Sequence, residues 1–139
     1  MSERIRAGYP LAVDEAAVTG WLTDYVAAWT SYDPAAIAEL FSEDAVYRYH
    51  AWDGLDDAAR GRDAIVASWL EEPDAAGTWT AEYRPWIVEG DRAVAVGLSR
   101  YLAADGTTIE REFHNVFLLE FDSDGRCREF TELYMSRPS

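Results

Sequence analysis

The last quarter of the chain, Glu110–Pro138, constrains the fold more than any other segment. Its residues alternate between apolar and polar side chains on both sides of the turn Asp122–Gly125. An acidic turn that ends in glycine, between two alternating segments, is a strong signal of a β-hairpin. We therefore predict two long antiparallel strands here, each with one face turned toward a core.

Alternation sorts the side chains of these two strands onto two faces. On the first strand, one face carries Phe113, Asn115, Phe117, Leu119 and Phe121. On the second strand, one face carries Arg128, Phe130, Glu132 and Tyr134. A polar group on a buried face costs about 1–3 kcal/mol if it is left unpaired. Asn115 and Glu132 are therefore expected to have partners, to line a pocket, or both.

Length and composition limit the class of protein. A chain of 139 residues with 49% hydrophobic content predicts one globular domain over residues 1–139, with residues 1–12 as a loose N-terminal arm. A net charge of -14 excludes nucleic acid and an anionic membrane surface as partners, because both require a basic face. The sequence shows no secretory signal and no apolar stretch of membrane-spanning length, so we expect a cytoplasmic protein.

Cysteine and histidine usage limits the chemistry. The lone cysteine, Cys127, excludes an internal disulfide and a cysteine metal cluster, and alternation places it on the strand face opposite Phe130. The two histidines, His50 and His114, do not have the spacing of metal ligands, and no glycine-rich phosphate loop is present. We therefore predict no metal and no cofactor.

Helical periodicity appears in the first half of the chain. Asp14 is expected to cap a first helix that runs to about Ser31, and Asp33-Pro34 to begin a short second helix through Phe41. The apolar spacing over Arg62–Glu71 predicts a third helix.

Strand patterns fill most of the remainder. Strands are predicted over Ala45–His50, Thr78–Val88, Arg92–Leu102 and the two arms of the final hairpin. Ser42–Asp44 is expected to be a turn, and Asp53–Gly61 a loop. Helices that come first and a strand meander that follows are typical of an α+β fold. A strongly curved antiparallel sheet wrapped around three N-terminal helices would enclose a cone-shaped cavity.

Several of these segments resemble a known superfamily. Similarity to the nuclear transport factor 2-like superfamily is carried by Tyr25–Trp29, Asp33, Ile37, Leu40-Phe41, Glu43–Ala45, Gly61–Ile65 and Trp69. Similarity to its SnoaL-like branch is carried by Asn115–Phe117, Phe121 and Asp124–Arg126. The resemblance covers about Asp14 to Tyr134 and implies the cone-shaped fold. This fold hosts isomerases, cyclases, dehydratases and non-catalytic binders, so it does not by itself imply one activity.

The resemblance also implies roles for individual residues. Tyr25 matches the tyrosine that donates to the oxyanion in ketosteroid isomerase, whose general-base aspartate is replaced by Tyr49 here. Scytalone dehydratase, of the same fold, has an active-site tyrosine near Tyr49 and an active-site asparagine that aligns with Asn115. With Glu132 from the alternation argument, the candidate catalytic residues are Tyr25, Tyr49, Asn115 and Glu132.

Candidate ligand-binding residues complete the cavity. They are Trp29, Tyr47, Trp69, Arg100, Phe117, Phe130 and Tyr134. Alternation with Val94, Val96 and Leu98 places Arg100 on the cavity side. Two readings of Glu132 remain open: a buried ion pair with Arg100 that orders the pocket, or a proton acceptor whose pKa is raised by burial.

The outer face of the late strands predicts a homodimer, because it is too apolar to be left in water. Its residues are Val116, Leu118, Cys127, Thr131, Leu133 and Met135. Two functions remain open. One is a cofactor-independent isomerase, cyclase or dehydratase that acts by proton transfer on a small apolar or aromatic oxygenated molecule. The other is a non-catalytic ligand-binding or assembly module that uses the same cavity.

Overall fold

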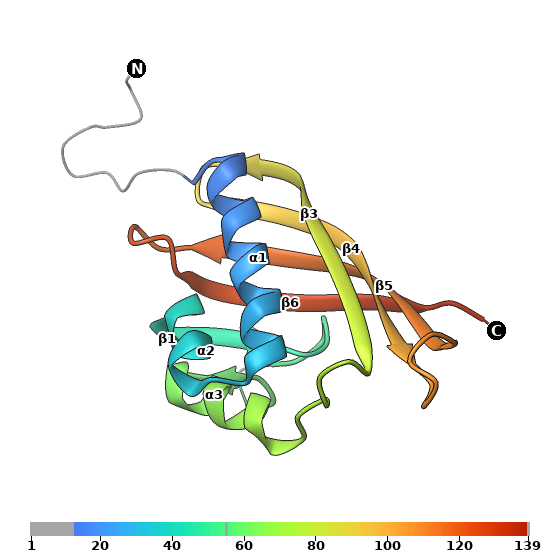
Figure 1. Cartoon of the computed structure of the whole chain (residues 1–139). Helices are drawn as coiled ribbons and strands as arrows, with labels where there is room; N and C mark the ends of the chain where they lie inside the picture. Colours follow the sequence, from blue (N-terminus) through green and yellow to red (C-terminus); the bar gives the residue numbers. More distant parts are fainter. Residues whose placement is uncertain (1–12, 55, 139) are drawn as a thin grey trace.

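A computed structural model describes residues 13–54 and 56–138 of the chain, so the predicted arm over residues 1–12 lies outside the described residues. The helices are α1 (Glu15–Ser31), α2 (Pro34–Leu40) and α3 (Arg62–Glu71). The strands are β1 (Phe41–Arg48), β2 (Ala59–Arg60), β3 (Trp79–Glu89), β4 (Arg92–Leu102), β5 (Ile109–Phe121) and β6 (Cys127–Ser136). Figure 1 shows α1 lying across one face of the curved sheet, with α2 and α3 beside β1. The predicted α+β fold is confirmed. None of the described helices is long and apolar enough to cross a membrane.

In the described residues the strands form one sheet in the order β2-β1-β6-β5-β4-β3. Strands β3 to β6 form the predicted antiparallel meander. Strand β1, however, pairs in parallel with β6, so the prediction of a purely antiparallel sheet is wrong at this edge. The physical reason is that no hairpin joins β1 to β6. Strands that are distant in sequence are free to pair in either direction, because only a tight turn forces antiparallel pairing.

The helix ends follow from local hydrogen bonding. Asp14 Oδ1 accepts from the backbone N–H of Ala17 at 2.8 Å, which caps α1. Asp33 caps α2 in the same way, ahead of a proline at the first helical position. Helix α1 ends at Ser31, and the next residue, Tyr32, caps it in the left-handed conformation with φ 51°.

Two local predictions between α2 and α3 are wrong. Ser42–Asp44 belongs to β1 and is not a turn, and Ala59–Arg60 forms the short strand β2 inside the predicted loop. The pairing of β1 with β6 shifts register between Phe41 and Val46. This irregularity accommodates a polar run within the strand, so polarity alone does not separate it from a turn.

The core lies between α1 and the inner face of the sheet, which is the face toward α1. Trp21 packs edge-on against Phe41 and Phe121, and Tyr25 stacks on Phe130 with ring centroids 5.7 Å apart. The indole N–H of Trp21 donates to the Leu40 carbonyl at 2.9 Å. Each fully buried aromatic side chain contributes about 1.5–3 kcal/mol. This aromatic layer holds α1 against β5 and β6.

A β-bulge changes the face of the first residues of β6. Phe121 pairs with Cys127 and Glu120 pairs with Glu129, so Arg128 is an extra residue on this strand. Cys127 is therefore fully buried in the core, and Arg128 points outward, where its Nε lies 2.6 Å from Glu120 Oε2. The predictions that placed Cys127 on the outer face and Arg128 beside Phe130 are both wrong.

Strand β4 is oriented opposite to the prediction from its apolar residues. Its inner face carries small side chains: Ala93, Ala95, Gly97 and Ser99. A Cβ on Gly97 would lie 2.6 Å from the ring of Tyr83 and would also collide with the Glu82 carbonyl oxygen. Small residues are needed here because the rings of Tyr83 and Phe117, whose centroids are 4.7 Å apart, fill the space in front of this face. The valines and Leu98 therefore face outward.

Candidate functional site

A pocket of about 380 Å³ lies between the C-terminal half of α1 and the inner face of strands β3 to β6. Its aromatic walls are Tyr25, Trp29, Tyr83, Tyr101, Phe113 and Tyr134. Its polar side chains are Asp74, Ser99, Arg111, Asn115 and Glu132. Aromatic walls with convergent polar groups are typical of a site for a small molecule that carries polar groups of its own.

Two smaller hollows share residues with this pocket. One of about 190 Å³ shares Tyr25 and Trp29 and adds Tyr47, Tyr49 and Trp69. The other, of about 290 Å³, shares Glu132 and Tyr134 and adds Tyr49, His50 and Trp52. The structure therefore brings Tyr25, Tyr49, Asn115 and Glu132 together around adjoining hollows.

Glu132 is the partly buried acid of this site. It lies on β6 opposite Phe117, and burial raises its pKa from 4.5 to about 7, an effect that the nearby His50 partly opposes. The amide nitrogen of Asn115 donates to Glu132 Oε2 over 3.5 Å, while Asn115 Oδ1 accepts from Ser99 Oγ at 3.2 Å. A carboxyl that is partly protonated near neutral pH can both accept and donate a proton.

Tyr25 and Tyr47 form a buried hydroxyl pair. Their oxygens are 3.3 Å apart, and both rings lie against Phe130. Burial, followed by the charge of Glu132, raises the pKa of Tyr25 well above its ordinary value. Burial, followed by the charges of Tyr25 and Glu132, does the same to the pKa of Tyr47. Both hydroxyls therefore keep their protons and act as hydrogen-bond donors, not as bases.

Tyr49 has a different arrangement. Its hydroxyl lies 2.6 Å from Ser68 Oγ, and Ser68 in turn donates to the Ile65 carbonyl at 2.9 Å. Because the Ser68 hydroxyl donates its proton to the Ile65 carbonyl, the Tyr49 hydroxyl is the donor in its bond to Ser68 Oγ. This bond joins the end of β1 to α3 and fixes the Tyr49 ring at the edge of the hollow.

The predicted position of Arg100 is wrong. Its Nε lies 2.8 Å from Glu112 Oε1 on the outer face of the sheet, away from Glu132. The cause is the inverted orientation of β4, whose small residues face inward. The predicted ion pair between Glu132 and Arg100 is therefore also wrong, because Arg100 pairs with Glu112 instead. Phe117 and Phe130 are also more deeply placed than predicted, because both are buried beneath Tyr25 and line none of these hollows.

Sequence reasoning missed His50. Alternation from Tyr49 placed it on the opposite face, but β1 ends at Arg48 and both residues lie in a bend. Asp53 accepts from the backbone N–H groups of Tyr49 and His50 and lies 3.2 Å from His50 Nδ1. Trp52 stacks on the imidazole at 4.7 Å. An aspartate that follows a strand end is a signal for such a turn and could have revealed it.

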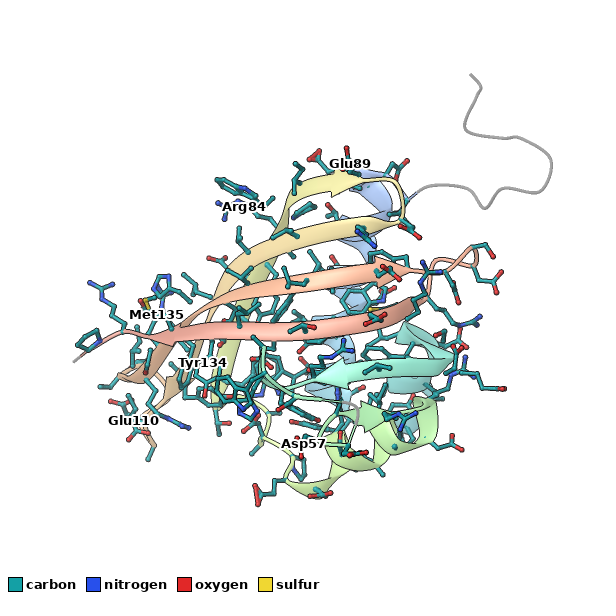
Figure 2. The ribbon with its side chains drawn as sticks, turned by 180° about the vertical axis from the view of Figure 1, so that it is seen from behind. Asp57, Arg84, Glu89, Glu110, Tyr134 and Met135 are labelled. Atoms are coloured by element: carbon teal, nitrogen blue, oxygen red, sulfur yellow. The ribbon has the colours of Figure 1, made fainter. Side chains whose placement is uncertain are left out.

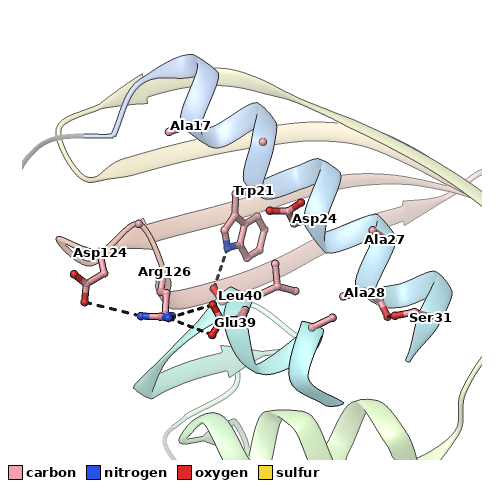
Figure 3. A pocket seen from close by; sticks show the side chains of 13 residues that line it. Ala17, Trp21, Asp24, Ala27, Ala28, Ser31, Glu39, Leu40, Asp124 and Arg126 are labelled. Atoms are coloured by element: carbon pink, nitrogen blue, oxygen red, sulfur yellow. Dashed lines mark hydrogen bonds and ion pairs between the residues drawn. The ribbon is translucent and has the colours of Figure 1, made fainter. Parts of the chain in front are cut away.

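A larger hollow of about 650 Å³ lies outside this site, between α1, α2 and the β5–β6 turn. Figure 3 shows its walls of small side chains, with Arg126 between Glu39 and Asp124 at its rim. The indole N–H of Trp21 is already bound to Leu40. This groove therefore offers no buried acid or base. Among the described residues, no three His, Cys, Asp or Glu side chains form a group that could hold a metal.

Comparison with known proteins agrees with the fold. The model of the family described as the SnoaL-like domain matches residues 22–130. None of the curated proteins matches this sequence.

Solved structures with the same fold come from several bacteria. A Kribbella flavida protein whose suggested activity is ketosteroid isomerase has a TM-score of 0.64 and 17% identity, over 91% of this chain and 83% of its own. An NTF2-like protein of unknown function from Mesorhizobium loti has a TM-score of 0.60 and 28% identity, over 87% and 93%. A Sinorhizobium meliloti protein whose suggested activity is polyketide cyclase has a TM-score of 0.61 and 20% identity, over 87% and 100%. These likenesses confirm the fold that the sequence resemblance implied.

Proposed function

Because the chain belongs to the SnoaL-like domain family, we propose that it binds a small apolar or aromatic oxygenated molecule in the pocket around Glu132 and catalyses a proton transfer on it. The reaction is an isomerisation, a cyclisation or a dehydration that needs no cofactor. One observation carries the proposal: the partly buried carboxyl of Glu132, with a pKa of about 7, lines an aromatic pocket and contacts a neutral amide.

The chemistry follows from the positions of the donors and the acid. Glu132 removes a proton from a carbon next to a substrate carbonyl, and returns it to another atom of the same molecule. Negative charge then develops on the carbonyl oxygen. Tyr25 lines the pocket, keeps its proton, and has Tyr47 behind it as a second hydroxyl. Such donors stabilise the developing charge.

The test uses proton exchange on a probe ketone. In deuterated buffer, the protein is expected to speed deuterium uptake at the carbon next to the carbonyl of 2-tetralone, as measured by NMR. Glu132→Gln should lower the rate above background by a factor on the order of 10²–10⁴ with little loss of binding. Glu110→Gln is the matched control, because Glu110 is exposed at the start of β5. Equal rates in the two variants would contradict the proposal.

A non-catalytic binder is the second candidate. The bond from Tyr49 to Ser68 favours it, because the residue at the position of the isomerase's base is here a phenol already held by a neighbour. This candidate predicts saturable binding of 2-tetralone with no exchange above background. A measured exchange rate that depends on Glu132 would exclude it.

We also propose that the protein is a homodimer that pairs through the outer face of the sheet. Figure 2 views this side and labels Arg84 and Met135 on it. Leu118 is 44% exposed and Met135 is 74% exposed, beside the valines of β4. An apolar area of this kind favours a second sheet over water. Leu118→Arg should convert a dimer into a monomer in sedimentation at micromolar concentration, and Leu70→Arg on α3 should not.

A further inference from the structure

Arg111 carries a positive charge at the outer end of the candidate pocket. It pairs across the strands with Tyr101, and its guanidinium carbon lies 4.5 Å from the centre of that ring and 5.8 Å from the centre of the Phe113 ring. Stacking on aromatic rings holds the planar guanidinium but uses none of its five N–H donors. The group is therefore positioned and still able to bind an anion.

Arg111 combines the lack of a carboxylate partner with a place in the wall of the candidate pocket. The net charge is -14, and the outward-facing Arg92, Arg100 and Arg128 form ion pairs. Arg84 forms none among the described residues, but it lines none of the hollows described above. In the part of the chain that the structure describes, Arg111 forms none, although it lines the pocket. A cation that stays unpaired among so many carboxylates, in the wall of a pocket, fits an anionic ligand group.

Asp74 is a possible partner for this charge, because it lines the same pocket. Its Oδ2 accepts from the indole N–H of Trp29 at 3.1 Å and from the Tyr32 hydroxyl at 3.5 Å. Its backbone N–H also binds the Tyr32 oxygen at 2.8 Å. These bonds connect the loop before β3 to the end of α1 and occupy Asp74 Oδ2. Among the described residues, no ion pair joins Asp74 to Arg111.

The distance between Arg111 and Glu132 sets the length of the ligand. Glu132 lies opposite Phe117, six positions along β5 from Arg111, which corresponds to about 20 Å of strand. Both side chains line the same pocket of about 380 Å³, so a ligand that contacts both must be elongated. A pocket of this volume fits two linked or fused rings, with the aromatic walls of the pocket along their faces.

We propose that Arg111 binds a carboxylate at one end of an elongated aromatic ligand whose other end lies at Glu132. The guanidinium fork matches a carboxylate through two parallel hydrogen bonds. A carboxylate is favoured over a phosphate, because a single arginine beside Asp74 neutralises one negative charge but not two. This inference rests on the proposed function, since it assigns the ligand of the same pocket.

The experiment compares two probes that differ only in charge: biphenyl-4-carboxylate and biphenyl-4-carboxamide. Calorimetric titration at low salt should show the wild-type protein binding the carboxylate about tenfold more tightly than the amide. Arg111→Gln should remove this preference and leave the amide affinity unchanged. Arg84→Gln, the same loss of charge on the outer face, should preserve the preference.

Other outcomes separate this inference from the proposed function. If wild type binds both probes equally, or if the preference survives Arg111→Gln, the carboxylate assignment is wrong while the pocket remains a binding site. If Arg111→Gln weakens both probes by the same factor, Arg111 only supports the Tyr101 wall, and the assignment is again wrong. If neither probe binds the wild-type protein, the assignment falls together with the proposed ligand class.

Discussion

The amide nitrogen of Asn115 lies 3.5 Å from Oε2 of Glu132 on the neighbouring strand. The partner of this partly buried acid is therefore neutral. A cation at this position would hold the pKa of Glu132 low, whereas an amide leaves burial as the main influence and the pKa at about 7. The capacity of Glu132 to exchange a proton near neutral pH thus depends on a side chain that has no charge.

The raised pKa of Glu132 predicts a pH-dependent stability. Below pH 4.5 both the folded and the unfolded chain hold this proton; between pH 4.5 and about 7 only the folded chain keeps it. The free energy of unfolding should therefore fall as pH rises through this range, by about 3 kcal/mol in total. Glu132→Gln should lack this decrease. Urea unfolding at pH 5 and pH 8 measures the difference, and parallel changes in both proteins would contradict it.

A second acid beside Glu132 should make this dependence steeper. Asn115→Asp would place two carboxyl groups next to each other, and the pair would resist losing its second proton. We expect the variant to be more destabilised at pH 8 than at pH 5, as measured by thermal unfolding. Asn115→Leu, which adds no titrating group, should show a loss that is similar at the two pH values.

Two glycines should respond in opposite directions to the same substitution. Gly97→Ala should destabilise the protein by about 1–3 kcal/mol, because its Cβ would collide with the Glu82 carbonyl and the Tyr83 ring. Gly20→Ala, within α1 and with no atom near its Cβ, should stabilise it by about 0.5–1 kcal/mol. Denaturant unfolding of both variants tests the packing of β4 against β3.

The bond between Tyr49 and Ser68 should appear as a coupling energy. Single variants Tyr49→Phe and Ser68→Ala each break the 2.6 Å contact, and the double variant breaks it only once. The double-mutant cycle should therefore show a coupling of about 1 kcal/mol. A coupling near zero would mean that the hydroxyl of Tyr49 is available to a ligand.

Residues with an unambiguous alternation were placed correctly from the sequence, and residues beside irregular backbone were not. Asn115 and Glu132 follow regular strand and lie where alternation predicts. Arg128 follows a bulge, and His50 follows a strand end, so the period of two fails at both. Neither Cys127–Glu129 nor Arg48–His50 contains a glycine or proline that would indicate irregular backbone.

Strand β4 shows a different limit of sequence reasoning. Its valines predicted a buried face, but small residues occupy that face because Tyr83 and Phe117 fill the interior. The inner and outer faces of this strand are both partly apolar, so hydrophobicity alone does not distinguish them. The placement of Arg100 depended on this choice, and only the packing of neighbouring strands determines it.

The parallel pairing of β1 with β6 has a consequence for when the site can exist. Tyr47 pairs with Phe130, two residues before Glu132, so the earliest strand of the chain borders the last one. Such a contact forms slowly, because the entropy of closing a long loop is lost before the contact contributes any stability. Partly folded chains that lack it leave Glu132 in water with an ordinary acidity. The raised pKa of Glu132 should therefore appear late in refolding. It should be detected as an uptake of protons near neutral pH after the hairpins have formed.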